Sequence, residues 1–210
     1  MLDIAGLRQN TTSGFRSALA ETALGLGLDP SFLAACMKVE TGGTFSPSIR
    51  NPFSGATGLI QFMPDTALAY GTTVDQLARM SATKQLEYVK RYFAPYAGRI
   101  RRDVPGDYYL AVFWPAAIGR DKSEVIASAG DTVYAQNAGL DRDGDGRITV
   151  GDVTATVDGV VSNALTRPPI EVQVGASVFA WAFGTLVVGL VGMAAYERRR
   201  DIKALVSKHT

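Results

Sequence analysis

The sequence predicts a mainly α-helical protein. Apolar residues recur at helical spacing between residues 12 and 93, which predicts a helical domain. An acidic run at residues 141–152 and an uncharged stretch at 174–196 predict two additions to it, a loop and a long apolar helix. We expect a helical domain over 1–137, an acidic loop with a flanking helix over 138–160, a linker over 161–173, an apolar membrane-spanning helix over 174–196 and a basic tail over 197–210.

Composition narrows the chemistry open to the chain. It has 210 residues, 47% of them hydrophobic, which suffices for one domain of ordinary size with smaller appendages. Its single cysteine, Cys36, excludes an internal disulfide, and its single histidine is His209. Zinc hydrolases and Ser-His or Cys-His hydrolases need a histidine within the folded domain. We therefore expect any catalysis to depend on carboxylates.

Charge does not indicate a nucleic-acid partner. The net charge is +1, but residues 197–210 hold five basic and two acidic side chains, so the rest of the chain is slightly acidic.

Residues 1–11 lack the apolar core of an export signal, and we expect no cleavable signal there. Helical spacing and caps predict helices over 12–26, 64–70, 74–80 and 81–93.

A further helix is predicted from Asp29 and Pro30 to about Thr41, because aspartate caps a first turn, proline tolerates the first helical position, and two glycines follow. Glu40 continues the apolar stripe of this helix, which comprises Phe32, Leu33, Cys36 and Met37. Partial burial and the negative end of the helix dipole should raise the pKa of Glu40, as a general acid requires. The alternative is an ordinary helix-end glutamate that points to water.

Two blocks of sequence surround this glutamate. Residues 40–43 read Glu-Thr-Gly-Gly, and residues 55–64 read Gly-Ala-Thr-Gly-Leu-Ile-Gln-Phe-Met-Pro. In this order and spacing they resemble the soluble lytic transglycosylase family, which is related to goose-type lysozyme. The family has serine where this chain has Thr41 and methionine where it has Ile60. The resemblance implies a lysozyme-like fold.

The resemblance also implies a sugar-binding groove. Glu40 would be the catalytic acid and base, with Asn51 and Gln61 as polar groups of the groove. An amide side chain such as Gln61 suits an amino sugar because it offers two donors and an acceptor. Met63 and Phe62 would form apolar walls, although simple core packing is the alternative for one of the two.

A third block lies at residues 107–119, where the sequence is similar to the phage-type form of the family pattern. Tyr109 and Phe113 are the candidate groove aromatics, because flat rings stack on sugar faces. Packing of both rings in the core is an equal alternative. Val112 stands where the phage-type pattern has histidine, and Trp114 is a further departure.

The acidic run predicts a calcium site. Its spacing matches an EF-hand loop, with an aspartate at position 12 as in dockerin-type loops. The expected ligands are the side chains of Asp141, Asp143, Asp145, Thr149 and Asp152 and the backbone carbonyl of Arg147. Three carboxylates within five residues repel one another unless a cation neutralises them. We expect a structural Ca²⁺ site, and a metal-free acidic turn is the alternative.

Residues 174–196 are long enough to cross a membrane, since a helix of this length spans about 34 Å against a hydrocarbon core of about 30 Å. Arginines at 198–200 predict a cytoplasmic C-terminus and an outward-facing domain. The expected partners are a lipid membrane and peptidoglycan glycan strands. An outward domain without an export signal suits a phage protein, in a virion membrane or the host envelope, among other virion or envelope proteins.

The function implied by the resemblance is cleavage between N-acetylmuramic acid and N-acetylglucosamine. Glu40 would protonate the leaving oxygen and then take a proton from the attacking hydroxyl. In lytic transglycosylases this hydroxyl is the sugar's own C6 group, so no second carboxylate is required, unlike in ordinary glycosidases. A hydrolytic muramidase on the same scaffold and a structural virion or membrane protein that binds glycan are the alternatives.

Overall fold

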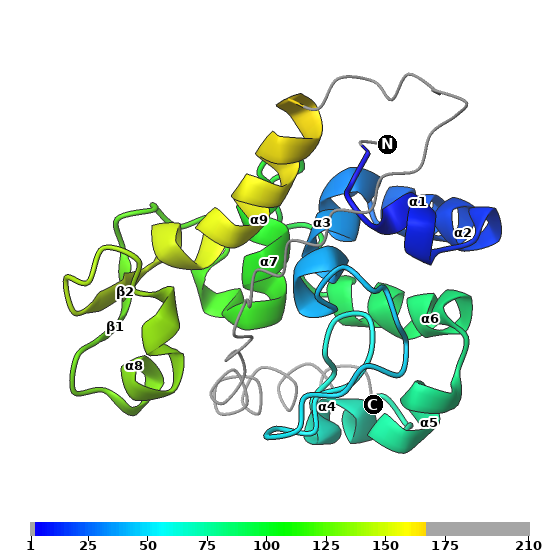
Figure 1. The fold of residues 1–210 in the computed structure, drawn as a ribbon, viewed down its shortest axis with the longest axis horizontal. Helices are drawn as coiled ribbons and strands as arrows, with labels where there is room; N and C mark the ends of the chain where they lie inside the picture. The colour runs from blue at the N-terminus through cyan, green and yellow to red at the C-terminus, as the bar shows by residue number, and fades with distance from the viewer. Residues whose placement is uncertain (1–2, 167–210) are drawn as a thin grey trace, which may run out of the picture.

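The computed structural model describes residues 3–166, which fold into helices, the loops that join them and one two-stranded antiparallel sheet (Figure 1). The mainly α-helical class is confirmed. The elements are α1 (Leu7–Asn10), α2 (Ser13–Leu24), α3 (Pro30–Glu40), α4 (Pro64–Ala69), α5 (Val74–Arg79), α6 (Ala82–Phe93), α7 (Pro105–Phe113), η1 (Pro115–Ala117), β1 (Val125–Ser128), α8 (Thr132–Asn137), η2 (Ala138–Leu140), β2 (Arg147–Thr149) and α9 (Val150–Thr166).

Local sequence signals account for where several helices begin. Asp29 caps α3 by accepting a hydrogen bond from the Ser31 N–H at 2.7 Å, and Pro30 occupies the first helical position. Ser81 caps α6 in the same manner. Thr73 forms a reciprocal capping box with Gln76 at the start of α5. These three helices begin where the sequence predicts.

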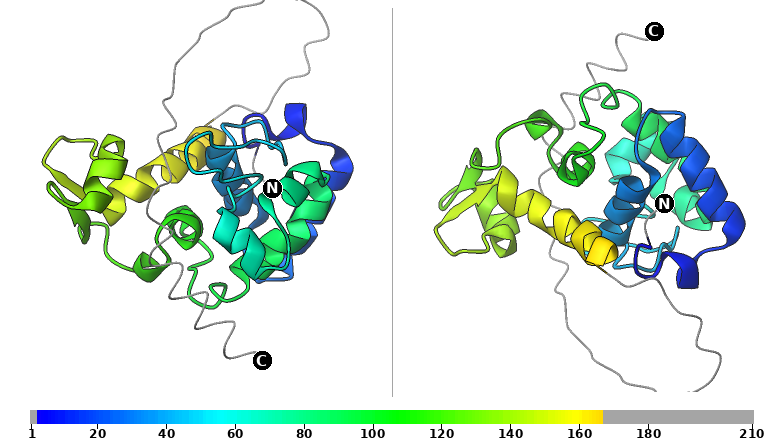
Figure 2. Two further views of the ribbon diagram at one scale, coloured as in Figure 1. Left: turned by 90° about the horizontal axis from the view of Figure 1, so that it is seen from below. Right: turned by 90° about the horizontal axis from the view of Figure 1, so that it is seen from above.

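The core gathers around α7, which is buried along nearly its whole length. This helix packs against α3 and α9, and α2 packs against α3 and α6 (Figures 1 and 2). The Tyr108 hydroxyl ties α7 to the start of α3, because it accepts a hydrogen bond from the Asp29 N–H at 2.7 Å and donates to the Arg102 carbonyl at 3.1 Å. Burial raises the pKa of Tyr108 to about 12, so this link persists at neutral pH.

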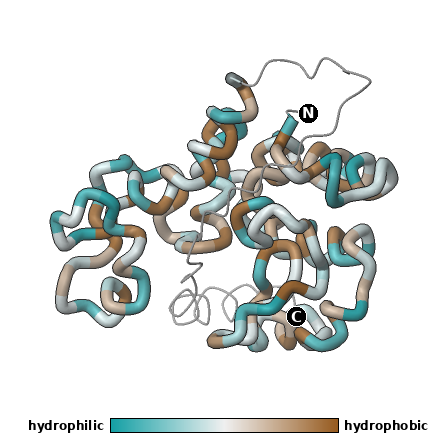
Figure 3. Tube along the Cα trace, in the orientation of Figure 1, coloured by the Kyte–Doolittle hydropathy of each residue, from teal (hydrophilic) through white to brown (hydrophobic). Residues whose placement is uncertain are grey.

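A second aromatic cluster fills the space under α6. Tyr92 is buried and donates its hydroxyl to the Ala111 carbonyl at 3.0 Å. Its ring meets Phe62 edge to face at 6.0 Å between centroids and Tyr96 at 5.9 Å. Hydrophobic stretches recur along the central helices in Figure 3. The cluster therefore connects α6 with α7 and with the loop that precedes α4.

The acidic loop lies in a lobe formed by α8, β1 and β2, at one side of the molecule (Figures 1 and 2). Strands β1 and β2 pair antiparallel, with Ala127 opposite Ile148 and Ser128 opposite Arg147. The sequence analysis does not predict this pairing. Its signal is weak, because β1 has only four residues and two of them are alanine and serine.

Helix α9 leaves this lobe and crosses to the central helices (Figure 2). It continues to Thr166, so residues 161–166 are helical rather than part of the expected linker. The physical reason is that Val161 still contributes to the buried stripe of α9. The rest of the linker, the predicted transmembrane helix at 174–196 and the basic tail at 197–210 lie outside the described residues. Within residues 3–166, no helix is long and apolar enough to span a bilayer.

Candidate functional site

Glu40 is the last residue of α3 and is half-buried. The turn after it is held by Thr41, which is fully buried. The Thr41 hydroxyl donates to the Met37 carbonyl at 2.7 Å and accepts from the Phe45 N–H at 3.0 Å. These two hydrogen bonds fix the backbone where α3 ends, and with it the backbone of Glu40.

The glycines after Glu40 are required by the backbone. Gly42 and Gly43 have φ values of 59° and 82°, in the left-handed region that favours glycine. The Gly43 N–H closes the end of the helix by donating to the Lys38 carbonyl at 2.8 Å. The Gly43 carbonyl accepts from the Asn10 side chain at 2.8 Å. The N-terminal segment is therefore packed against the turn that follows Glu40.

The block at 55–64 forms a compact loop. Thr57 lies in antiparallel bridges with both Arg50 and Phe62. Gly58 has a φ of 87°, and a side chain on it would place its Cβ 2.4 Å from the Gln85 amide oxygen. Glycine is therefore necessary here both for conformation and for space. The loop fits closely against α6.

Gln85 is the anchor of this loop and was not singled out by the sequence analysis. It is fully buried on α6. Its amide oxygen accepts from the Leu59 N–H at 3.0 Å, and its amide nitrogen donates to the Pro47 and Leu77 carbonyls, both at 2.7 Å. The available signal was its position one turn before Val89, on the apolar stripe of an amphipathic helix. A polar residue there needs internal partners.

Asn51 serves the loop that connects the two blocks. Its side-chain oxygen accepts from the Phe53 N–H at 2.9 Å and the Ser54 N–H at 3.1 Å, and its own N–H donates to the Ala56 carbonyl at 2.8 Å. This is an Asx turn. The side-chain oxygen of Asn51 therefore shapes the loop.

Gln61 is also held internally. It is 7% exposed and has a φ of 48°. Its amide nitrogen donates to the Gly58 carbonyl at 3.0 Å and to the Ile49 carbonyl at 3.3 Å. Its two N–H donors are thus used within the loop, so only the amide oxygen can serve a ligand without breaking these bonds.

The candidate groove aromatics are buried. Tyr109 is 1% exposed and Phe113 is 8% exposed, and their rings stack at 6.1 Å between centroids. Both lie on α7, which packs against the helix that ends at Glu40. Phe62 also belongs to the core, whereas Met63 is half-buried at the start of α4. Core packing is therefore the better description of three of these four residues.

Three carboxylates of the acidic loop lie together. One oxygen atom from each of Asp141, Asp143 and Asp145 lies within 4.8 Å of the others, so the three side chains could hold a metal ion. Helix α9 follows the loop, as the sequence predicts, and α8 and η2 precede it. The Tyr134 hydroxyl donates to Asp141 at 2.7 Å and, with backbone amides of the loop, holds the pKa of Asp141 below its usual range. The carboxylate form of Asp141 is the form that binds a cation.

The remaining expected ligands have other contacts. Asp152 accepts from the Thr149 N–H at 2.9 Å and the Thr149 hydroxyl at 2.6 Å, and its own N–H donates back to that hydroxyl at 3.2 Å. The two residues thus form a mutual cap at the start of α9. The Arg147 side chain pairs with Asp145 at 2.7 Å. Of the four predicted carboxylate ligands among the described residues, Asp141, Asp143 and Asp145 form the cluster and Asp152 does not join it.

Comparison with known proteins gives no further assignment. Neither models of protein families nor curated protein sequences match the chain. The functional assignment therefore depends on the three sequence blocks, the acidic loop and the geometry described above.

Proposed function

We propose that this protein is a membrane-anchored lytic transglycosylase that cleaves the bond between N-acetylmuramic acid and N-acetylglucosamine in peptidoglycan. It would open the cell wall locally during genome entry as a phage virion-associated protein, with its domain facing outward and its C-terminus cytoplasmic. Residues 174–196 would provide the membrane anchor. The phage assignment comes from the predicted outward-facing topology and from the similarity of residues 107–119 to the phage-type motif.

The observation that best supports this proposal is the setting of Glu40. Glu40 is a half-buried carboxyl group at the C-terminal end of a well-packed helix, which is a position that a general acid and base can occupy. The turn that follows and the loop at 55–64 are both held by buried side chains, Thr41 and Gln85. Catalysis benefits from such fixed positions.

In the proposed reaction, Glu40 donates its proton to the leaving glycosidic oxygen. The resulting carboxylate then removes a proton from the C6 hydroxyl of the muramic acid residue, which attacks C1 and closes a 1,6-anhydro ring. One carboxyl group performs both proton transfers. A hydrolytic muramidase would differ in using water as the attacking group, and its product would be heavier by one water.

A second candidate function is glycan binding without cleavage, in a structural virion or membrane protein. The burial of Tyr109 and Phe113 and the internal hydrogen bonds of Gln61 favour it, because these residues then offer less surface to a sugar than the motifs imply. Both candidates use the same loops. They differ in what Glu40 does.

The deciding experiment is a zymogram on purified peptidoglycan with the full chain, Glu40→Gln and a control, Glu21→Gln, which changes an exposed glutamate on α2. We expect clearing by the wild type and Glu21→Gln, and a loss of at least about 100-fold in Glu40→Gln, since general acid–base catalysis contributes roughly 10²–10⁴-fold. Product masses would identify the anhydro end. Equal clearing by all three proteins contradicts the mechanism, and folded proteins that all fail to clear favour glycan binding.

We also propose that the acidic loop binds Ca²⁺ as a structural ion. Three clustered carboxylates supply the hard oxygen ligands that Ca²⁺ prefers, and the ion would remove their mutual repulsion. Because α9 begins beside the loop and packs against α3 and α7, ordering of the loop would stabilise the domain.

This calcium proposal predicts that a chelator lowers the melting temperature of the wild type but not of Asp141→Ala. Ligand linkage gives about 2.7 kcal/mol of stabilisation at a Ca²⁺ concentration 100 times the Kd. Asp121→Ala is the control, since Asp121 is exposed and lies outside the loop. The proposal fails if wild-type melting is the same with and without the chelator.

A further inference from the structure

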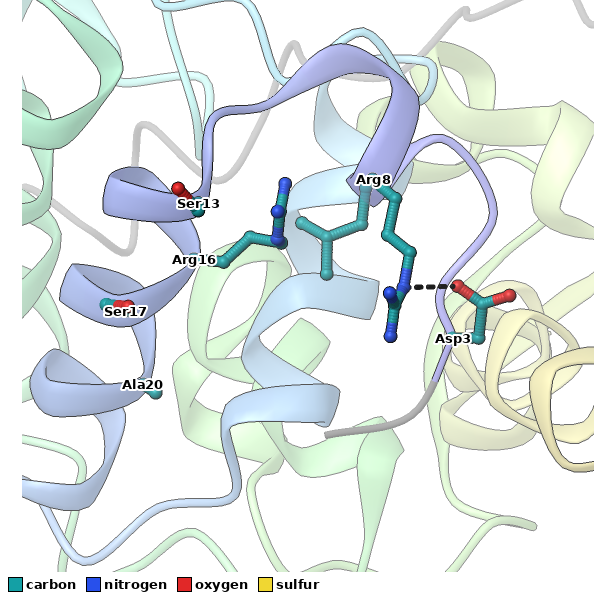
Figure 4. A pocket seen from close by; sticks show the side chains of 7 residues that line it. Asp3, Arg8, Ser13, Arg16, Ser17 and Ala20 are labelled. Carbon is teal, nitrogen blue, oxygen red and sulfur yellow. Dashed lines mark ion pairs between the residues drawn. The ribbon is translucent and has the colours of Figure 1, made fainter. Parts of the chain in front are cut away.

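A pocket of about 340 Å³ lies between the N-terminal segment, α1 and α2, apart from Glu40 and from the acidic loop. This volume is at the lower end of the range of about 300–1,000 Å³ found for ligand pockets. Helix α2 contributes one face to it, with Ser13, Arg16, Ser17 and Ala20, and the other wall is Asp3, Leu7 and Arg8. Figure 4 shows Arg16 and Arg8 extending from their two helices toward the space between them.

One of the two guanidinium groups is held in place by the protein. Arg16 donates through Nη1 to the Thr11 carbonyl at 2.7 Å and to the Thr11 hydroxyl at 3.4 Å. That hydroxyl donates in turn to the Leu7 carbonyl at the start of α1. The Nε and Nη2 groups of Arg16 take no part in these bonds. Arg16 is therefore oriented before a ligand arrives, which lowers the entropy cost of binding.

The charges of the pocket favour a monoanion. Arg8 and Arg16 contribute two positive charges and Asp3 one negative charge, which leaves a net charge of +1. Asp3 contacts Arg8 through Nε at 3.4 Å. The planar guanidinium groups suit a carboxylate, which can accept two parallel hydrogen bonds from one arginine. The serine hydroxyls offer further donors.

The apolar part of the lining selects the rest of the ligand. Ala20, which is half-buried on α2, supplies apolar surface beside the charged groups. We propose that this pocket binds a carboxylate that carries a small apolar group, such as the C-terminal residue of a short peptide. Peptide branches of peptidoglycan end in such groups. Only this connection between the ligand and peptidoglycan rests on the proposed function.

The test is calorimetric titration of the full chain with N-acetyl-D-alanine, with N-acetyl-D-alaninamide and inorganic phosphate as comparison probes. We expect saturable binding of the acid, no binding of the amide and weaker binding of phosphate. Arg8→Gln and Arg16→Gln should each weaken binding by about tenfold or more, because each removes hydrogen bonds to a charged group. Asp3→Asn should strengthen binding, since it removes a competitor for Arg8.

Two controls separate this site from its surroundings and from catalysis. Arg102→Gln, which changes an exposed arginine elsewhere, should bind like the wild type, and so should Glu40→Gln. Arg8 has a side chain that is 71% exposed, so Arg8→Gln serves as the folded test if Arg16→Gln is unstable. The inference is overturned if the amide binds as well as the acid, if phosphate binds more tightly, or if Arg8→Gln and Arg102→Gln behave alike.

Discussion

Replacement of Gly58 by alanine should destabilise the domain more than an ordinary glycine substitution. The φ of 87° at Gly58 costs alanine about 1–2 kcal/mol. The new Cβ would also lie 2.4–2.9 Å from the amide group of Gln85, which must then move. Gln85 makes three buried hydrogen bonds, each worth about 1 kcal/mol. The expected loss is about 4–5 kcal/mol, a large part of the roughly 5–15 kcal/mol of a typical domain.

Urea unfolding of the full chain, followed by circular dichroism, would measure this loss. The matched control is Gly71→Ala, since Gly71 has a φ of 75° but no atom within 4 Å of the position of a Cβ. This control carries the backbone strain without the collision. Equal losses in the two variants would refute the role assigned to Gln85. A double variant that combines Gly58→Ala with Gln85→Ala should lose less than the sum of the single changes.

Two further predictions concern α7. Burial works against the charge of Asp107, but its hydrogen bonds from Arg101, at 2.8–2.9 Å, outweigh burial and hold its pKa below the usual range. The stability that this carboxylate contributes is therefore present above about pH 4 and is lost as the pH falls through its lowered pKa. Asp107→Asn should lower the melting temperature at pH 7, and the melting temperature of this variant should fall less steeply as the pH is lowered. Gly106→Ala should lower the melting temperature because its Cβ would lie 2.6 Å from the side chain of Thr154. Gly159→Ala, with open space around it, should raise stability by about 0.5–1 kcal/mol. A Gly106→Ala variant as stable as Gly159→Ala would contradict close packing of α7 on α9.

Signals that act over a few residues predicted most of the helical fold. Asp29 and Pro30 determine the start of α3, because capping and the fixed φ of proline depend on adjacent atoms. Ser81 predicts α6 for the same reason. The repeated aspartates at 141–145 likewise predict their own cluster, since the loop that joins them is short.

The roles of the candidate groove residues were harder to predict because their partners come from distant segments. Gln61 could offer its amide to a sugar in principle, but the fold places the carbonyls of Gly58 and Ile49 within reach. The aromatic residues on α7, such as Tyr109, could line a groove or fill a core. Only the packing of α7 between α3 and α9 distinguishes these two roles. The role of Gln85 could not be predicted from the sequence blocks, because this residue lies on α6, outside residues 40–43 and 55–64.

Helix α9 determines how long a fragment of the chain must be to retain the packing around Glu40. The helix follows the acidic loop in sequence, yet Val153, Val157 and Val161 join the same buried core as α3 and α7. A fragment that stopped at residue 137 would leave the matching apolar surfaces of those two helices in water. The folding unit that carries Glu40 therefore includes the acidic loop and extends beyond Val161.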